Sequence, residues 1–324
     1  MRHVLPLSLL VAALAVLSLH LGLRPTGPAT VWRALWGEGQ DPAELIVRGL
    51  RLPRMALALG VGAALGVAGL LTQAALRNPV AEPGLIGVNA GAGFAVVLAL
   101  SVWQVGNLGL LILCAAFGAL AATALLFGIA GGGRGSAGPL RLLLSGVTVA
   151  ALLSAGTQVV IILDEKAMED LLFWLSGGFA DRPVAALGPA LPVMIGAAGI
   201  AWFYAAVLDV LAADDETAQA LGLPVVTARI AMLGLAALLA GTAVAVAGPV
   251  AFIGLGAPHL ARAMRVMGHA RLLPLAALWG AALALAADIL ARYLIWPGEA
   301  PLSAVTALAG VPLLLALLHR RAPA

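Results

Sequence analysis

The chain has 324 residues, of which 62% are hydrophobic and 10% are charged, and its formal net charge is +3. A soluble globular protein carries roughly 25% charged residues, so the composition predicts that lipid surrounds most of this chain. Its lysines and arginines are spread thinly between apolar runs, which excludes the basic, aromatic-rich stripe of a nucleic-acid-binding protein. The single cysteine, Cys114, excludes a disulfide framework and a cysteine metal cluster.

The first apolar run covers residues 4–23. A secretory signal has a shorter apolar core of roughly 7–15 residues and a small-residue cleavage site, and no clean site of that kind follows this run. The run approaches the roughly 20 residues that a helix needs to span a bilayer. We therefore expect a retained first transmembrane helix.

Further apolar runs follow in chain order and are joined by short links. They cover residues 55–76, 84–102, 108–130, 142–163, 184–211, 229–248, 274–295 and 302–319, and a shorter run covers 250–261. No alternating strand pattern is present, so helices must satisfy the backbone polar groups in the bilayer. The sequence predicts an all-α polytopic membrane protein of about ten transmembrane helices, forming one domain over residues 1–324 and binding no cofactor.

Basic residues give a weak prediction of orientation. With both termini in the cytoplasm, the inner side would hold Arg2, Arg77, Arg134, Arg141, Arg229, Arg262, Arg265, Arg271, Arg320 and Arg321. The outer side would hold Arg24, Arg33, Arg48, Arg51, Arg54, Lys166, Arg182 and Arg292. This slight excess follows the positive-inside rule, except in the arginine-rich first outer loop. Either the orientation is reversed or these arginines bind an acidic partner.

A short internal echo predicts an inverted-topology repeat. Residues 79–85 (PVAEPGL) recur as residues 249–255 (PVAFIGL), after the second and the seventh predicted helices respectively. An odd number of crossings separates these helices, so the two copies face opposite sides, as in many transporters. The prediction pairs helices two to five with helices seven to ten, in half-repeats of about 51–163 and 225–319. Chance similarity among common residues is the alternative.

Residues 213–224 (ADDETAQALGLP) form a second informative link. Asp214 or Asp215 can cap a short helix, and Gly222 and Pro224 can end it. An amphipathic link on the membrane surface would have the same pattern. The glycine-rich link at residues 131–136 lacks the GK[ST] ending of a phosphate-binding loop, so any ATPase is expected in a separate subunit.

Motifs along most of the chain resemble one family. Residues 78–93 (NPVAEPGLIGVNAGAG) form a rigid, polar corner between two apolar runs. Further motifs are RLPR (51–54), LLLSGV (142–147), FWLSGGF (173–179), ALGLP (220–224), AGPVAFIGLGAPHLAR (247–262), AADILAR (286–292) and EAPLSAVTALAGVP (299–312). Their order is similar to that of the permease subunits of type II ABC importers for iron-siderophores, haem and cobalamin.

The resemblance implies partners and site residues. A periplasmic or lipoprotein binding protein would dock on Arg51, Arg54 and Arg292 at the outer face, and we expect Arg51 and Arg54 at an exposed rim position. Snorkelling to headgroups, and pairing of Arg292 with Asp288 at i,i+4, are the alternatives. The resemblance places a coupling helix, seated on an ATPase subunit, at Asp215, Thr217, Ala218, Leu221 and Gly222. Asp214 departs from the family pattern, in which a small residue is usual.

The resemblance also implies a pathway between two identical or homologous permease subunits, served by two ATPase subunits in a bacterial or archaeal inner membrane. Asn78 and Val80 would form the cytoplasmic gate. The pathway wall would carry the polar residues of the 142–163 helix: Ser145, Thr148, Ser154, Thr157 and Gln158. These residues equally suit helix–helix hydrogen bonds. An iron-siderophore is the leading substrate, with cobalamin and haem as alternatives.

The alternative classes of function are a secondary transporter and an intramembrane enzyme. A secondary transporter also uses inverted repeats and needs ionisable groups within the membrane, for which Asp209 and Asp288 are the acids within the apolar runs. An intramembrane enzyme would need a nucleophile and base, and no such constellation is apparent in the sequence. His259 has no second ligand nearby in sequence, so we expect a hydrogen-bonded histidine rather than a metal site.

Overall fold

A computed structural model describes residues 3–22, 24–37, 41–131, 138–180, 182, 184–295 and 298–319. Within these ranges every regular element is a helix, which confirms the predicted all-α class. Four arginines assigned above to the cytoplasmic side lie outside the described residues, as does most of the glycine-rich link at residues 131–136. The four are Arg2, Arg134, Arg320 and Arg321.

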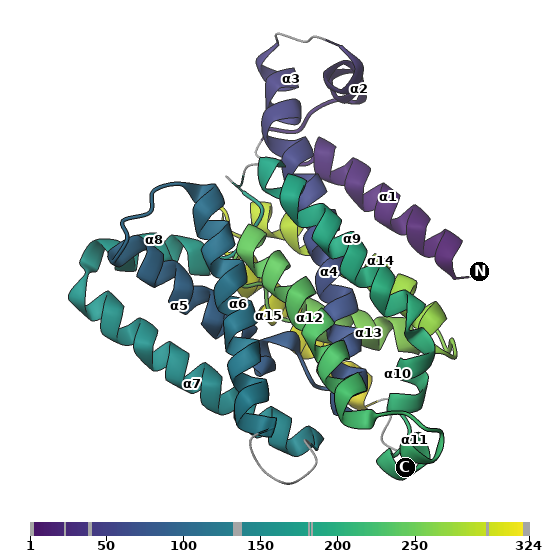
Figure 1. Ribbon diagram of the computed structural model, residues 1–324. Helices are drawn as coiled ribbons and strands as arrows, with labels where there is room; N and C mark the ends of the chain where they lie inside the picture. The colour runs from purple at the N-terminus through teal and green to yellow at the C-terminus, as the bar shows by residue number, and fades with distance from the viewer. Residues whose placement is uncertain are drawn as a thin grey trace.

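Each predicted apolar run contains a helix (Figure 1). These helices are α1 (Val4–His20), α4 (Leu52–Leu76), α5 (Val88–Ser101), α6 (Leu108–Gly131), α7 (Pro139–Leu163), α9 (Leu187–Phe203), α10 (Ala205–Leu211), α12 (Val225–Ala247), α13 (Ile253–Ala263), α14 (His269–Leu294) and α15 (Leu302–His319). Among the described residues, six helices are long and apolar enough to cross a membrane, and α1 and α5 are apolar but shorter. The fold is therefore that of a polytopic membrane protein, and the count of ten crossings stays a prediction.

Shorter helices occupy the links. They are α2 (Pro28–Trp36), α3 (Pro42–Ile46), the π-helical turn Val47–Arg51, the 3-10 turns Pro83–Ile86 and Val184–Ala186, α8 (Glu165–Leu175) and α11 (Asp215–Ala220). Of these, the sequence predicted only α11. In α2 and α3 a proline opens the helix, where its missing N–H costs no hydrogen bond. The predicted run 184–211 also differs, because the helix breaks at Tyr204 between α9 and α10.

Helix α4 lies at the centre of the bundle and packs against α12, α13 and α14. Its contact with α14 runs over small residues. A Cβ atom on Gly66 would lie 2.2 Å from the carbonyl oxygen of Ala276, and one on Gly62 would lie 2.5 Å from that of Gly280. Such close backbone contact stabilises helix pairs in lipid, where the hydrophobic effect gives little drive for association. The α4–α14 pair therefore depends on glycine at these positions.

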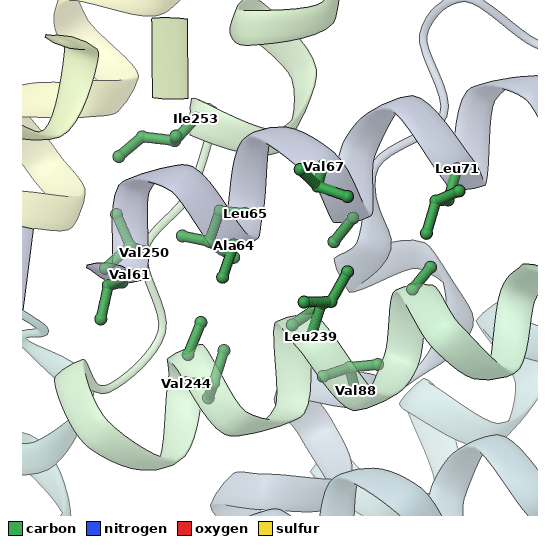
Figure 2. Packing of buried hydrophobic residues seen from close by; sticks show 14 of the residues in the cluster. Val61, Ala64, Leu65, Val67, Leu71, Val88, Leu239, Val244, Val250 and Ile253 are labelled. Carbon is green, nitrogen blue, oxygen red and sulfur yellow. The ribbon is translucent and has the colours of Figure 1, made fainter. Parts of the chain in front are cut away.

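Helices α4 and α12 cross antiparallel. Figure 2 shows Val61 to Leu71 of α4 facing Val244 to Leu239 of α12, and Arg229 at the start of α12 donates to Ala75 O at the end of α4. α4 packs on α14, and α12 packs in the same way on α6. These matched contacts are what an inverted repeat predicts. The half-repeat boundaries, 51–163 and 225–319, stay a prediction.

The two echo segments meet within the bundle. The Glu82 carboxylate accepts a 2.9 Å hydrogen bond from the backbone N–H of Phe252, and Gly254 lies against the ring of Pro83. Phe252 takes a left-handed backbone conformation with φ 71° at the N-terminus of α13. The carboxylate therefore satisfies a backbone donor that α13 leaves without a helical acceptor, and it joins the two segments whose sequences resemble each other.

Candidate functional site

Helix α11 lies at one end of the bundle, and α2 and α3 lie at the other (Figure 1). Asp214 is the N-cap of α11, because its Oδ1 accepts from Thr217 N and its Oδ2 accepts from Thr217 Oγ1, each at 2.7 Å. These hydrogen bonds lower the pKa of Asp214. Gly222 ends the segment with φ 78°. The predicted short, capped helix is confirmed, and the residue that departs from the family pattern is its cap.

The predicted coupling residues divide between the two faces of α11. Leu221 is 68% exposed, and Thr217 and Gly222 are exposed beside it. Ala218 is fully buried against the bundle, and Asp215 faces two arginines of the bundle. An ATPase subunit could therefore contact the first three directly, whereas Ala218 and Asp215 hold the helix in place.

Asp215 joins α11 to the ends of α4 and α12. Its Oδ1 accepts from Arg229 Nη2 at 2.8 Å and from Arg77 Nη2. Arg77 Nε also donates to Leu211 O at 2.8 Å. Partial burial would raise the pKa of Asp215, but the hydrogen bonds and charges of both arginines outweigh burial and lower it. Asp215 is therefore a carboxylate at neutral pH.

The predicted gate residues follow Arg77 directly. Arg77 ends α4 in a left-handed conformation with φ 48°, which is uncommon for a residue with a Cβ atom. The side-chain oxygen of Asn78 accepts from Val80 N at 3.0 Å and closes a tight turn. Asn78 is half-buried, and Val80 is exposed. Both lie beside the cluster that anchors α11.

The predicted pathway residues lie on α7, of which the rest of the chain buries little. Ser154 and Gln158 are exposed. Thr148 and Thr157 donate to the carbonyl oxygens of Leu144 and Leu153 in the preceding turn. Ser145 differs from the others because it is buried.

At the other end of the bundle the three predicted docking arginines are drawn inward. Arg51 is buried, and its guanidinium donates to the carbonyl oxygens of Leu19, His20 and Arg24 and to Thr26 Oγ1. The expectation of an exposed rim position is wrong for Arg51, because its donors are used to hold the link after α1.

Arg54 and Arg292 share the buried carboxylate of Asp288. Arg54 Nε donates to Asp288 Oδ1 at 2.6 Å, and its Nη1 donates to Glu299 at 2.8 and 2.9 Å. Arg292 binds Asp288 Oδ2 and also donates to the backbone and hydroxyl oxygens of Ser18. Arg292 is 3% exposed. Its predicted pairing with Asp288 is confirmed.

Asp209 and His259 also have structural partners. Asp209 accepts from the backbone N–H of His269 at 2.9 Å and from its Nδ1 at 2.7 Å. His259 Nδ1 lies 2.9 Å from Leu255 O, which confirms the expected hydrogen-bonded histidine. In the part of the chain that the structure describes, no group of three or more His, Cys, Asp or Glu side chains could hold a metal ion.

Similarity to known proteins identifies the family of this chain. Residues 9–320 match the FecCD transport family. The chain belongs to this family. It is 39% identical over 318 residues to the ferric enterobactin transport system permease protein FepD of Escherichia coli (strain K12), covering 97% of this chain and 94% of FepD. It is 38% identical over 317 residues to the Fe(3+) dicitrate transport system permease protein FecD of the same organism, covering 97% of each.

A solved structure agrees with this assignment to the FecCD family. A metal-chelate type ABC transporter in an inward-facing conformation matches with a TM-score of 0.86 and 30% identity, covering 98% of this chain and 99% of the other. This FecCD chain is therefore the permease subunit of an ABC importer, a transport component of a bacterial inner membrane and not an enzyme.

Sequence reasoning missed three residues of the FecCD sites. Arg77 and Arg229 were counted only as inner-side charges, and Glu82 was treated as part of a polar corner. Arg229 is the only charged residue of α12, and a lone charge in a spanning segment signals a functional contact. For Arg77 and Glu82, the partners lie 138 and 170 residues away, so no local pattern could have named them.

Proposed function

We propose that this FecCD permease carries a ferric chelate, an iron-siderophore first, from a periplasmic or lipoprotein binding protein to the cytoplasm. Cobalamin and haem are the alternative cargoes. Both relatives described above are named for ferric chelates, which supports iron. Two ATPase subunits and a second permease, identical or homologous, complete the importer in this proposal.

The observation that carries the proposal is the form of α11. The short, capped helix α11 lies at one end of the bundle (Figure 1). The apolar side chain of Leu221, directly after this helix, is exposed. An exposed apolar side chain next to rigidly held backbone suits a groove in a protein partner. We assign that groove to an ATPase subunit and place α11, together with both termini, on the cytoplasmic side.

The uncovered face of α7 supports the pairing of two permeases. A spanning helix that its own chain hardly covers must face lipid or a partner, and Thr148, Ser154 and Gln158 add polar groups to that face. Thr157 is half-buried, and Ser145 points into the bundle. We assign the α7 face to the pathway between the subunits, with Asn78 and Val80 at its cytoplasmic gate.

The outer arginines remain candidates for docking of the binding protein. Arg54 is only half-buried, and its partner Glu299 lies partly exposed beside it. Arg51 and Arg292 are buried, so we assign them the holding of this surface, with Arg54 nearest to the partner. Because Arg54 already binds Asp288 and Glu299, an acidic residue of the binding protein would share Arg54 with Glu299 or take its place.

Ion-coupled secondary transport finds no support among the acids that the sequence singled out. Asp288 is bound by two arginines, and Asp209 caps α14 through His269. Neither carboxylate is placed to bind and release an ion during a transport cycle, because each has a structural task.

Leu221→Asp tests the proposed coupling. The exposed position should tolerate the charge, but a carboxylate seated in an apolar groove loses its water without a partner, which costs about 3 kcal/mol. Affinity for the ATPase subunit encoded beside the permease should then fall roughly 100-fold, and uptake of radio-labelled ferric citrate should stop. Met267→Asp is the control, at an apolar residue that is 86% exposed in the α13–α14 link. Unchanged ATPase affinity and uptake in Leu221→Asp would show that α11 is only a surface link.

A further inference from the structure

An ionic cluster lies where α11 meets the ends of α4 and α12. One carboxylate oxygen, Asp215 Oδ1, is shared by Arg77 and Arg229. The two arginines come from the end of α4 and the start of α12, which belong to different half-repeats. A displacement of α11 must therefore move both arginines or break a charged contact.

The two arginines are held differently. Arg229 is 1% exposed, and its Nε donates to Ala75 O at 3.0 Å, inside the last turn of α4. Arg77 is half-buried, and its further contact is with Leu211 O of α10, next to α11. Arg229 thus joins the clustered charges to the end of α4, whereas Arg77 joins them to the end of α10, next to α11.

The position of Arg77 in the chain links this cluster to the gate. Its backbone forms the left-handed end of α4, and the turn at Asn78 and Val80 starts at the next peptide. A non-glycine residue in this conformation is held by its surroundings. A displacement of the Arg77 side chain would therefore act on the backbone dihedral angles of Arg77, and these angles set the direction in which residues 78–80 leave α4.

We propose that Asp215 and Arg77 transmit displacement of α11 to the Asn78–Val80 gate, with Arg229 as the fixed point of the link. Arg77 is thereby a positioning residue of the gate. This inference rests on the proposed function, because it takes α11 as the segment that the ATPase moves. It adds the charged contact through which that movement reaches the pathway.

The test uses the permease alone, in lipid nanodiscs, with Val80→Cys in a Cys114→Ala background. The rate at which a soluble maleimide labels Cys at position 80 reports the exposure of the gate. Asp215→Asn and Arg77→Gln should each change this rate at least about three-fold, a typical effect of residues that couple two sites. The double variant should change it no further than either single variant, because both break the same link.

Two controls separate transmission from loss of folding. Glu216→Gln removes the neighbouring carboxylate of the same helical turn and should keep the parental rate, and Arg77→Lys, which retains a charge for Asp215, should recover most of it. Thermal unfolding shows whether each variant is folded. If Asp215→Asn does not fold, the labelling rates of Arg77→Gln and Arg77→Lys are compared instead.

The outcomes distinguish this inference from the function on which it rests. Parental labelling rates in folded Asp215→Asn or Arg77→Gln, or additive effects in the double variant, would overturn the link. Leu221→Asp, which touches neither arginine, should label at the parental rate. If Leu221→Asp still binds the ATPase while the labelling effects appear as expected, the proposed docking fails and the link from α11 to the gate stands.

Discussion

Removal of the Asp288 carboxylate is the most direct test of the outer ionic network. Asp288 is 1% exposed and forms an ion pair with both Arg54 and Arg292. In Asp288→Ala, Arg54 keeps Glu299 as a partner, whereas Arg292 keeps only the neutral oxygens of Ser18 and Leu21. Most of the expected cost therefore comes from one buried guanidinium without a counter-charge, and such a loss costs about 3–5 kcal/mol.

Glu299→Gln is the matched control, because it also removes one carboxylate from Arg54. Glu299 is 35% exposed, and water can replace it, so we expect a cost of at most about 1 kcal/mol. Unfolding of both variants by sodium dodecyl sulfate in mixed micelles, followed by near-UV circular dichroism, measures the difference. Equal free energies of unfolding for Asp288→Ala and Glu299→Gln would refute the view that this network stabilises the outer end of the bundle.

Three further predictions concern topology, packing and pH. In a cysteine-free background, Arg33→Cys and Thr217→Cys, both at exposed sites at opposite ends of the bundle, should be labelled from opposite sides of sealed vesicles; labelling of both from one side would refute this topology. Gly66→Ala should destabilise the bundle by about 1–3 kcal/mol, because its methyl group would lie 2.2 Å from a carbonyl oxygen of α14, whereas Gly234→Ala, at a site with open space, should be neutral in the same unfolding assay. The pKa of Asp215 is lowered on folding, so its stabilising contribution should be complete above the ordinary aspartate range and be lost only as the pH falls through the lowered folded-state value; a difference in unfolding free energy between the parent and Asp215→Asn that changed between about pH 8 and pH 6 would contradict this.

The helices could be predicted because their signals are local. Apolar runs of spanning length, bounded by charges and prolines, gave each helix to within a few residues, and the Asp214 cap and Gly222 stop gave α11. Helices α2 and α8 were not predicted because they lie in links of mixed polar and apolar composition, and neither contains an apolar run long enough to span a membrane. The break at Tyr204 was missed because a continuous apolar run hides a change of direction.

Partners of the charged residues could not be predicted, because they are set by the fold. Sequence reasoning placed Arg51 at an exposed rim, but its acceptors are the carbonyl oxygens of Leu19, His20 and Arg24, which lie 27 to 32 residues earlier in the chain. The i,i+4 pair of Asp288 and Arg292 was foreseen because it lies within one helix. Arg54, which completes that network from 234 residues away, illustrates where local reasoning ends.

The glycine contact between α4 and α14 also limits how this protein can change shape. The backbones of α4 and α14 are in close contact at Gly62 and Gly66, so we expect the two helices to move together rather than separately. The bending must then fall at the two ends of α4, where the regular helix gives way to the π-helical turn Val47–Arg51 and to the left-handed Arg77. We therefore expect α4 and α14 to tilt together in a conformational cycle, with the backbone bending at the two ends of α4.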